Sequence, residues 1–509
     1  MPLRKDLIYV AHTGTDVDDS KKETAPPAEK SFLLKRNFLG TKEIAALGLS
    51  NLGSSLAEGY MGSFLMYFFT SVFRIDYRYI SLMYFLVTIW DAMNDPLMGI
   101  AFDKTRTRFG KARPYLLFSP IPLGICVALL FLGPIFFQGA DLLDTRKIVY
   151  MFVTYFLWET FNTVNGVPKG NLPLLMSPNP TERNKLFAVS NFLHEIGRGL
   201  PSLIIAPMID LSKSGVIKVS VTNSFAIIGV SVAILGTFLS LFAFFGTRER
   251  VMLIPKQPPV LQGVKYVFNN KPLLLQVLAG VMGCLGGIGG IYVNFFYIDV
   301  MGSATMSLVC GAVGTVIKYA SFGLIPWFFK RFKTKQMFFG FKIYVTVLKG
   351  IMFLVGRRYL HNLPMLAVTV IVVQALYSFV DGANGVLNSE LGADVQDYMV
   401  WQTGTRQEGT TGAVTGIISK FGNAISSAAS AIVLNMVGYQ QGAKEQSDDT
   451  KYKIFAMFAI VPQLLGLFSL IPWFFYDLWG DKRDKMRAEL AQMREIRARL
   501  YFDEQGAES

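Results

Sequence analysis

The sequence contains 509 residues, of which 52% are hydrophobic and 14% aromatic, and its mean hydropathy is +0.38. A soluble domain of this length cannot bury so much apolar material, so the composition excludes a soluble globular protein and indicates an integral membrane protein. The formal net charge of +13 does not indicate a nucleic-acid partner, because the Lys and Arg residues gather in the connections between apolar runs and not on a soluble module.

Twelve apolar runs are long enough to form membrane-spanning helices, each of which requires about 20 residues. They are predicted at 44–72, 79–102, 114–137, 148–173, 186–210, 223–246, 273–299, 304–329, 336–356, 364–392, 408–437 and 453–477. The pattern predicts an all-α membrane protein with one six-helix bundle at 44–246 and a second at 273–477.

The segments outside these bundles are polar. Residues 1–43 are interpreted as a flexible cytoplasmic arm, since they lack the apolar core of a signal peptide. Residues 247–272 contain several prolines and basic residues and are predicted to form a cytoplasmic linker. Residues 478–509 have mixed charge and are interpreted as a cytoplasmic helix and tail, solvated or anchored at the membrane surface. Placing both termini in the cytoplasm puts most connecting Lys and Arg residues inside, as the positive-inside rule favours.

Two carboxylates lie inside the second run. At that depth a charged side chain costs roughly 2.5–3.5 kcal/mol, so Asp91 and Asp95 are seldom retained without a use. Their four-residue spacing places them on one helical face, with Asn94 beside them. Pro96 has no N–H, which leaves the carbonyl of Ala92 available as a further ligand. This group of oxygens predicts a cation site, for a proton or for Na⁺ held by the two aspartates.

A basic turn follows the second run and has a weaker counterpart later in the chain. The first turn, DKTRTRFGK, precedes the third run, and KRFKTK at Lys330–Lys335 follows the eighth. Equivalent turns six runs apart indicate an internal duplication, as in many transporters.

Polar residues recur at 4-3-4 spacing on one face of four runs, where lipid cannot satisfy them. We therefore expect them to line a wet central cavity, although hydrogen bonding between packed helices, at about 0.6 kcal/mol each, remains an alternative for the asparagines and serines. The four stripes are Asn51, Ser55, Glu58 and Gly62; Tyr155, Glu159, Asn162 and Gly166; Tyr377, Asp381, Asn384 and Asn388; and Gly416, Lys420, Asn423 and Ser427.

The fifth run also contains polar and charged residues. Glu195 and Arg198 are three residues apart and are expected to neutralise each other. His194 is interpreted as a packed, hydrogen-bonded histidine, with a proton relay as the alternative.

Two long motifs resemble the glycoside–pentoside–hexuronide:cation symporter family, whose best-known member is the melibiose permease. They are DAMNDPLMGIAFDKTRTRFGKARPY in the second run and its turn, and ADVQDYMVWQTGTRQEG at Ala393–Gly409, followed by Lys420. The resemblance covers about 44–477 and implies the major facilitator architecture, in which two six-helix bundles enclose a cavity. It also implies cation-coupled symport of a sugar, glycoside or uronide by alternating access, in a multi-pass protein of the cell membrane.

The resemblance also implies roles for single residues. Asp91, Asn94 and Asp95 match the family's cation-site positions, and Lys420 matches the lysine that couples the cation and sugar sites. Glu159 falls where the family has a sugar-binding aspartate.

Other substrate positions match less directly. Tyr155 and Asn162 share the polar face of Glu159, and Asn191 falls near the family's helix-five arginine. The helix-one aspartate falls near Ser55, with Glu58 one turn away. We expect Tyr155, Asn162, Asn191 and Glu58 to contact substrate together with Glu159.

Two positions on the fourth run depart from the family. The threonine that completes the sodium site falls at Phe156, and the tryptophan that stacks on sugar falls at Thr163. Loss of the threonine hydroxyl favours a proton over Na⁺ as the coupling ion, because a proton needs only one carboxylate and the like charge of a neighbouring carboxylate raises its proton affinity.

Three other functions remain to be weighed. An amphipathic lipid could be the cargo, which the abundant Phe residues permit and the polar stripes oppose, or sugar transport could be uncoupled. An intramembrane aspartyl protease is a remote alternative, because its two aspartates are expected on different helices. We expect no enzyme activity and no cofactor beyond the coupling ion. We expect the chain to act as a monomer. Its expected partners are a small-molecule sugar and membrane lipid.

Overall fold

The computed structural model describes residues 38–139, 141–177, 179–250, 268–403, 408–441, 443 and 445–492. Most of the predicted N-terminal arm, much of the predicted linker and the end of the tail therefore lie outside the described residues. Within the described ranges the chain is helical, and its one β-type pairing is an isolated bridge between Thr107 and Gly110.

Helices connected by short turns make up the first half of the described chain. They are α3 (Thr41–Tyr67), η2 (Phe68–Val72), α4 (Tyr77–Lys104), α5 (Arg113–Phe118), α6 (Pro120–Phe136), α7 (Thr145–Met176), α8 (Pro180–Lys213), α9 (Val221–Ser240) and α10 (Phe242–Gly246). Side chains cap several of them: Asp76 accepts a hydrogen bond from the N–H of Arg78 at the start of α4, and Asp144 accepts one from the N–H of Arg146 at the start of α7.

The second half is more often interrupted by 3₁₀ or π-helical turns. Its elements are α12 (Lys271–Gly283), η3 (Cys284–Gly287), α13 (Ile288–Phe295), η4 (Phe296–Val300), α14 (Thr305–Ser321), η5 (Phe322–Leu324), α15 (Ile325–Arg331), α16 (Thr334–Gly356), η6 (Arg357–Tyr359), α17 (Leu363–Thr403), α18 (Glu408–Met436), α19 (Asp448–Ala459), α20 (Val461–Gly466), η7 (Leu467–Ser469) and α21 (Leu470–Phe474).

Seven helical stretches of the described chain are long and apolar enough to cross a membrane. They are Arg113–Phe136, Val221–Gly246, Lys271–Val300, Thr305–Arg331, Thr334–Tyr359, Leu363–Gln402 and Asp448–Phe474. The remaining predicted spans coincide with α3, α4, α7, α8 and α18, each at least 27 residues long. These helices carry the charged residues of the predicted site, which lower their hydropathy. The count of twelve spans stays a prediction.

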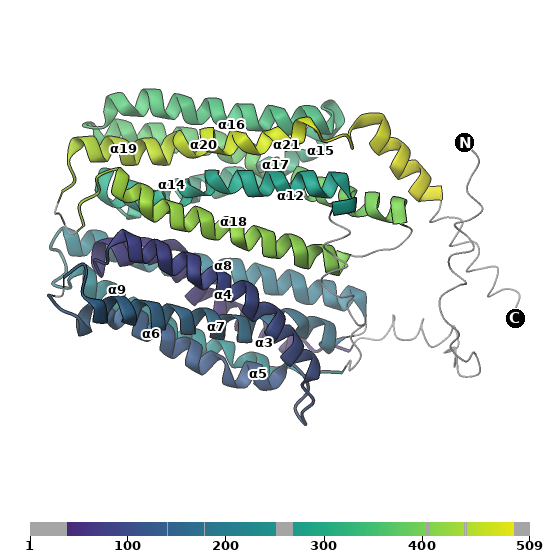
Figure 1. The fold of residues 1–509 in the computed structure, drawn as a ribbon, viewed down its shortest axis with the longest axis horizontal. Helices are drawn as coiled ribbons and strands as arrows, with labels where there is room; N and C mark the ends of the chain where they lie inside the picture. The colour runs from purple at the N-terminus through teal and green to yellow at the C-terminus, as the bar shows by residue number, and fades with distance from the viewer. Residues whose placement is uncertain are drawn as a thin grey trace, which may run out of the picture.

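The long helices run roughly parallel in two groups (Figure 1). In this view the helices of residues 41–246 lie below and most of those of residues 271–474 lie above, although the bundle boundaries themselves stay predictions. The groups meet where α18 packs against α4, α14 against α8 and α13 against α3. The contact between α4 and α18 brings the two helices with the most unusual intramembrane charges together.

A large aromatic-rich core extends across both groups. In the first, the rings of Phe68 and Phe131 lie with centroids 4.7 Å apart, and in the second Phe296 stacks on Phe458 at 4.1 Å and 6°. Aromatic pairs of this kind add to the stabilisation that burial alone supplies. This core fixes the ends of α3 and α13, where the two π-helical turns η2 and η4 begin.

Candidate cation and substrate site

Lys420 of α18 forms ion pairs with both aspartates of α4. Its Nζ lies 2.8 Å from Asp91 Oδ2 and also contacts Asp95 Oδ2. Asp91 is 8% exposed and Asp95 is half-buried, and two carboxylates this close together repel each other. One ammonium neutralises one of the two charges, and a cation that binds both carboxylates must displace it.

Thr163 of α7 completes this cluster. Its Oγ1 lies 3.2 Å from Asp91 Oδ1 and 3.2 Å from Asp95 Oδ1. A hydroxyl has one proton and two acceptor lone pairs, so the oxygen can donate to a carboxylate and still coordinate a cation. Thr163 is buried, which holds it at this position.

Thr163 supplies a hydroxyl beside the aspartates although the family's threonine position is occupied by Phe156. Thr163 follows Phe156 by two helical turns, so both lie on the same face of α7. The ring of Phe156 packs on Trp90 with centroids 4.7 Å apart, and Trp90 Nε1 donates to Thr160 Oγ1 at 2.9 Å. The hydroxyl beside the aspartates therefore comes from the position that the resemblance had assigned to a sugar-stacking tryptophan.

Asn94 is buried next to the pair and bonds to α7. Its Nδ2 donates a long hydrogen bond, 3.5 Å, to the backbone oxygen of Thr160. Of the predicted cation residues, the structure thus brings Asp91 and Asp95 together with Lys420 and places Asn94 alongside.

Glu159 lies on the same helix as Thr163, within electrostatic range of Asp91 and Lys420. Its Oε2 is buried and has no hydrogen-bond partner among the described residues. Such an atom loses the free energy of hydration without compensation, so a donor supplied by a substrate hydroxyl would stabilise it. Nearby, Tyr155 stacks on Trp158 with ring centroids 5.5 Å apart.

The other predicted substrate residues are spread over three helices. Glu58 Oε2 of α3 lies 3.7 Å from His194 Nε2 of α8, which pairs the predicted histidine with an acid from another helix. Asn162 is half-buried on α7, and Asn191 is exposed on α8.

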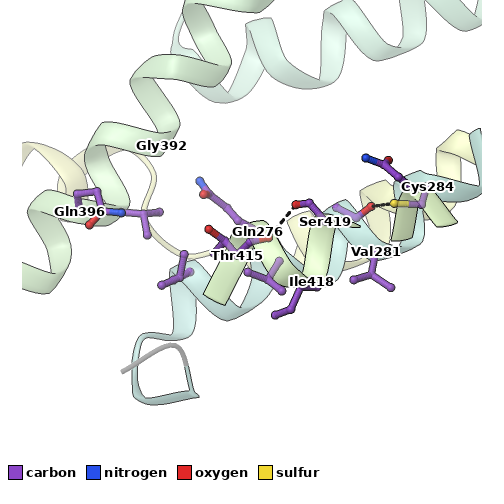
Figure 2. A pocket seen from close by; sticks show the side chains of 13 residues that line it. Gln276, Val281, Cys284, Gly392, Gln396, Thr415, Ile418 and Ser419 are labelled. Atoms are coloured by element: carbon purple, nitrogen blue, oxygen red, sulfur yellow. Dashed lines mark hydrogen bonds between the residues drawn. The ribbon is translucent and has the colours of Figure 1, made fainter. Parts of the chain in front are cut away.

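A cavity with no charged residue in its described lining lies between α12, α17 and α18 (Figure 2). Its volume is about 460 Å³, and its polar lining includes Gln276, Gln396, Thr415, Ser419 and Asn423. Figure 2 shows Gln276 of α12 close to Thr415 and Ser419 of α18. Of the lining residues, Thr415, Ser419 and Asn423 lie on α18, the helix that also carries Lys420.

A family model described as "MFS/sugar transport protein" matches residues 47–479. The chain belongs to this family. Membership confirms the expected all-α membrane fold of the major facilitator type and makes the protein a multi-pass transporter of the cell membrane, not an enzyme. The protease alternative is therefore excluded.

The proteins to which this chain is similar are transporters. The isoprimeverose transporter of Lactiplantibacillus pentosus is 26% identical over 92% of this chain and 95% of that protein. A glucuronide carrier protein homolog of Escherichia coli strain K12 is 27% identical over 91% and 98%. The crystal structure of a D-xylose-proton symporter superposes with a TM-score of 0.54, at 12% identity, over 87% of this chain and 98% of the other, and supports the fold.

Two lysines inside the predicted spans, Lys169 and Lys318, were given no partner from the sequence. Lys169 of α7 is 7% exposed, and its Nζ donates to Ser50 O and Ser54 Oγ, each at 2.6 Å. Lys318 of α14 binds Asp381 of α17 at 2.7 Å. Lysines within apolar runs were visible in the sequence, but spacing along one helix cannot identify partners on another.

The C-terminal helix, residues 480–492, corrects a further expectation. Arg483 is 6% exposed and binds Asp394 and Glu390 of α17, each at 2.6 Å. Trp401 Nε1 donates to Glu489 Oε2 at 2.7 Å. One face of this helix is therefore docked on α17, so it is not a free, fully solvated helix; its anchoring at the membrane surface stays a prediction.

Proposed function

We propose that this protein is a symporter that carries a glycoside or uronide together with a monovalent cation. The observation that supports the proposal is the ion pairing of Lys420 with both Asp91 and Asp95 across the two groups of helices. The relatives named for isoprimeverose and glucuronide transport support a sugar substrate.

Coupling follows from competition for the two carboxylates. Lys420 holds α18 against α4, and a cation that binds Asp91 and Asp95 releases this tie. The free energy of cation binding then shifts the balance between conformations, and substrate binding that prefers the released conformation strengthens cation binding by the same factor.

We propose Na⁺ as the coupling ion, in place of the proton favoured by the sequence. The preference for a proton rested on the loss of the threonine hydroxyl at Phe156 and on the like charge of a neighbouring carboxylate. Thr163 answers the first argument, because it supplies a hydroxyl 3.2 Å from each aspartate. The described residues contain no group of three or more His, Cys, Asp or Glu side chains that could hold a metal, so the site depends on neutral oxygens as well. The carboxylates of Asp91 and Asp95, the hydroxyl of Thr163, the side chain of Asn94 and the carbonyl of Ala92 together offer several oxygens to Na⁺.

For the substrate, we propose that Glu159 binds sugar hydroxyls and that the neutral cavity accommodates the remainder of the molecule. The buried, unpaired Oε2 of Glu159 supports the first role, with Tyr155, Asn162, Asn191 and Glu58 as further contacts. The side-chain amides and hydroxyls around the cavity can both donate and accept, as sugar hydroxyls require. We further propose that the protein acts as a monomer and that both termini face the cytoplasm.

Uptake by purified protein in liposomes tests the function. Radiolabelled glycosides, uronides and a lysolipid are supplied under an inward Na⁺ gradient at uniform pH, under a pH gradient without Na⁺, and under neither. We expect accumulation of a glycoside or uronide only with the Na⁺ gradient. Accumulation driven by pH alone would contradict the Na⁺ assignment. Equilibration without accumulation, or uptake of the lysolipid alone, would contradict sugar symport.

A further inference from the structure

Both groups of helices contain a π-helical turn at the same place. α3 passes into η2 and α13 passes into η4, each five residues long. In both, the N–H of the following residue binds the carbonyl of the first residue of the turn, Phe73 to Phe68 at 2.7 Å and Met301 to Phe296 at 2.9 Å. Single π-helical turns are uncommon and frequently mark functional positions.

The turns also end alike. Arg74 and Gly302 occupy equivalent positions and both have positive φ, 56° and 71°. A positive φ is rare for a residue with a side chain such as Arg74. Because Arg74 adopts it as Gly302 does, the repetition reflects the same local backbone and not a preference of glycine. By this equivalence Ser71 and Asp299, each the fourth residue of its turn, are counterparts in the two groups of helices.

The hydroxyl of Tyr439, just beyond α18, contacts both counterparts. It lies 2.8 Å from Ser71 Oγ and donates to Asp299 Oδ2 at 3.0 Å. Tyr439 is 6% exposed, and its ring packs edge-on against Phe295 at 5.1 Å. A phenol has one proton, so Tyr439 donates to the carboxylate and accepts from the serine, which joins the two π-helical turns through one atom.

Further bonds between the two groups surround this hydroxyl. Lys213 Nζ of α8 lies 3.7 Å from Asp299 Oδ1, and Tyr77 of α4 donates to the backbone oxygen of Tyr439 at 2.7 Å. Gln441 donates to the oxygen of Ile75 at 2.8 Å. These contacts lie at the end of the molecule where α18 ends and α19 begins, to the left in Figure 1.

From these contacts we propose that Tyr439, Ser71 and Asp299 form a latch that closes this end of the transporter. To admit substrate there, the two groups must separate, and the hydroxyl of Tyr439 then loses at least one partner. The latch therefore stabilises the conformation that is closed at this end, which is predicted to face the outside. This inference goes beyond the proposed function, because it requires neither a particular substrate nor a coupling ion.

Spin-label distance measurements on the full chain test the latch. Cys126, Cys284 and Cys310 are first replaced by alanine, and labels are attached at Leu143→Cys and Arg358→Cys, exposed positions of the two groups at this end. The distance distribution is recorded without substrate or gradient. Tyr439→Phe removes only the hydroxyl, and we expect the ratio of separated to closed molecules to rise about fivefold, the effect of losing the neutral hydrogen bond to Ser71, which crosses between the groups.

Two further variants complete the test. Tyr452→Phe is the matched control, since its ring packs on Phe353 within the second group, and its distribution should equal that of the wild type. Ser71→Ala removes the same bond between the groups and should shift the ratio in the same direction by a comparable factor. Identical distributions for wild type and Tyr439→Phe would overturn the latch, whatever ion or substrate the transport assay identifies.

Discussion

At the scale of single residues, the proposal of Na⁺ as the coupling ion depends on Thr163. Thr163→Val keeps the shape of the side chain and removes the oxygen that lies 3.2 Å from both aspartates. We expect the Na⁺ concentration for half-maximal uptake to rise about tenfold, the scale of one lost polar ligand of about 1.4 kcal/mol. Thr163→Ser retains the hydroxyl and should behave like the wild type. Equal Na⁺ dependence of the valine and serine variants would remove Thr163 from the site.

Glu159 is the residue on which substrate affinity should depend. Glu159→Gln preserves size but weakens the acceptor whose Oε2 is buried without a partner. We expect the dissociation constant for the transported sugar to rise about tenfold, as for the loss of one charge-assisted hydrogen bond. Calorimetric titration at saturating cation measures it, with Glu195→Gln as a control because that carboxylate is 71% exposed and pairs with Arg198 on its own helix. An unchanged dissociation constant in Glu159→Gln would exclude this contact.

The sequence predicted some of these residues and not others for a physical reason. Asp91, Asp95 and Lys420 are charges at membrane depth, and their cost made them conspicuous before any contact was known. Thr163 carries no such signal, because a threonine can satisfy its hydroxyl on its own helix. Its position against the aspartates depends on the rotation of α7 relative to α4, which spacing along one helix does not determine.

At the scale of elements, the C-terminal helix shows the same distinction. Its charges are compatible with a solvated surface, and their partners lie about 90 residues earlier in the chain, on α17. Local periodicity identifies the helix and its charged face but contains no information about what that face meets. The two π-helical turns were likewise invisible in the hydrophobic pattern, although FFTSVFR and FYIDVMG are now seen to occupy equivalent positions.

Docking of the helix formed by residues 480–492 should depend on Arg483. Arg483→Met leaves Asp394, which is 1% exposed, without one of its cationic partners, and breaking a buried ion pair costs about 3–5 kcal/mol. We expect amide hydrogen exchange within 480–492 to accelerate by at least about 100-fold. Lys485→Met is the control, because Lys485 is 70% exposed and pairs only weakly with Glu489 at 3.9 Å. Equal exchange in the two variants would show that the helix docks without this ion pair.

At the scale of the whole molecule, two kinds of contact join the groups of helices. The contacts around Tyr439 lie at one end, and the ion pairs of Lys420 lie midway along α4 and α18. The contacts around Tyr439 involve only protein groups, so their strength does not depend on the concentration of a ligand. Under the proposed function, the ion pairs of Lys420 compete with a bound cation, so their strength depends on cation concentration. A transporter whose closure depends on both can respond to the cation without losing its closed state.

Replacing Lys420 tests whether this arrangement couples the two ligands. In Lys420→Met a cation no longer displaces an ammonium from Asp91 and Asp95, so we expect Na⁺ to bind more tightly than in the wild type. In this variant the ion pairs between α4 and α18 are absent whether or not Na⁺ is bound. The sugar dissociation constant without Na⁺, divided by that with Na⁺, should therefore fall towards one. Calorimetry of each ligand alone and with the other measures both quantities. Lys318→Met, which breaks the pair with Asp381 inside the second group, should leave that ratio unchanged. If Lys420→Met keeps the wild-type ratio, the coupling free energy does not depend on the ion pairs of Lys420 and passes through other residues.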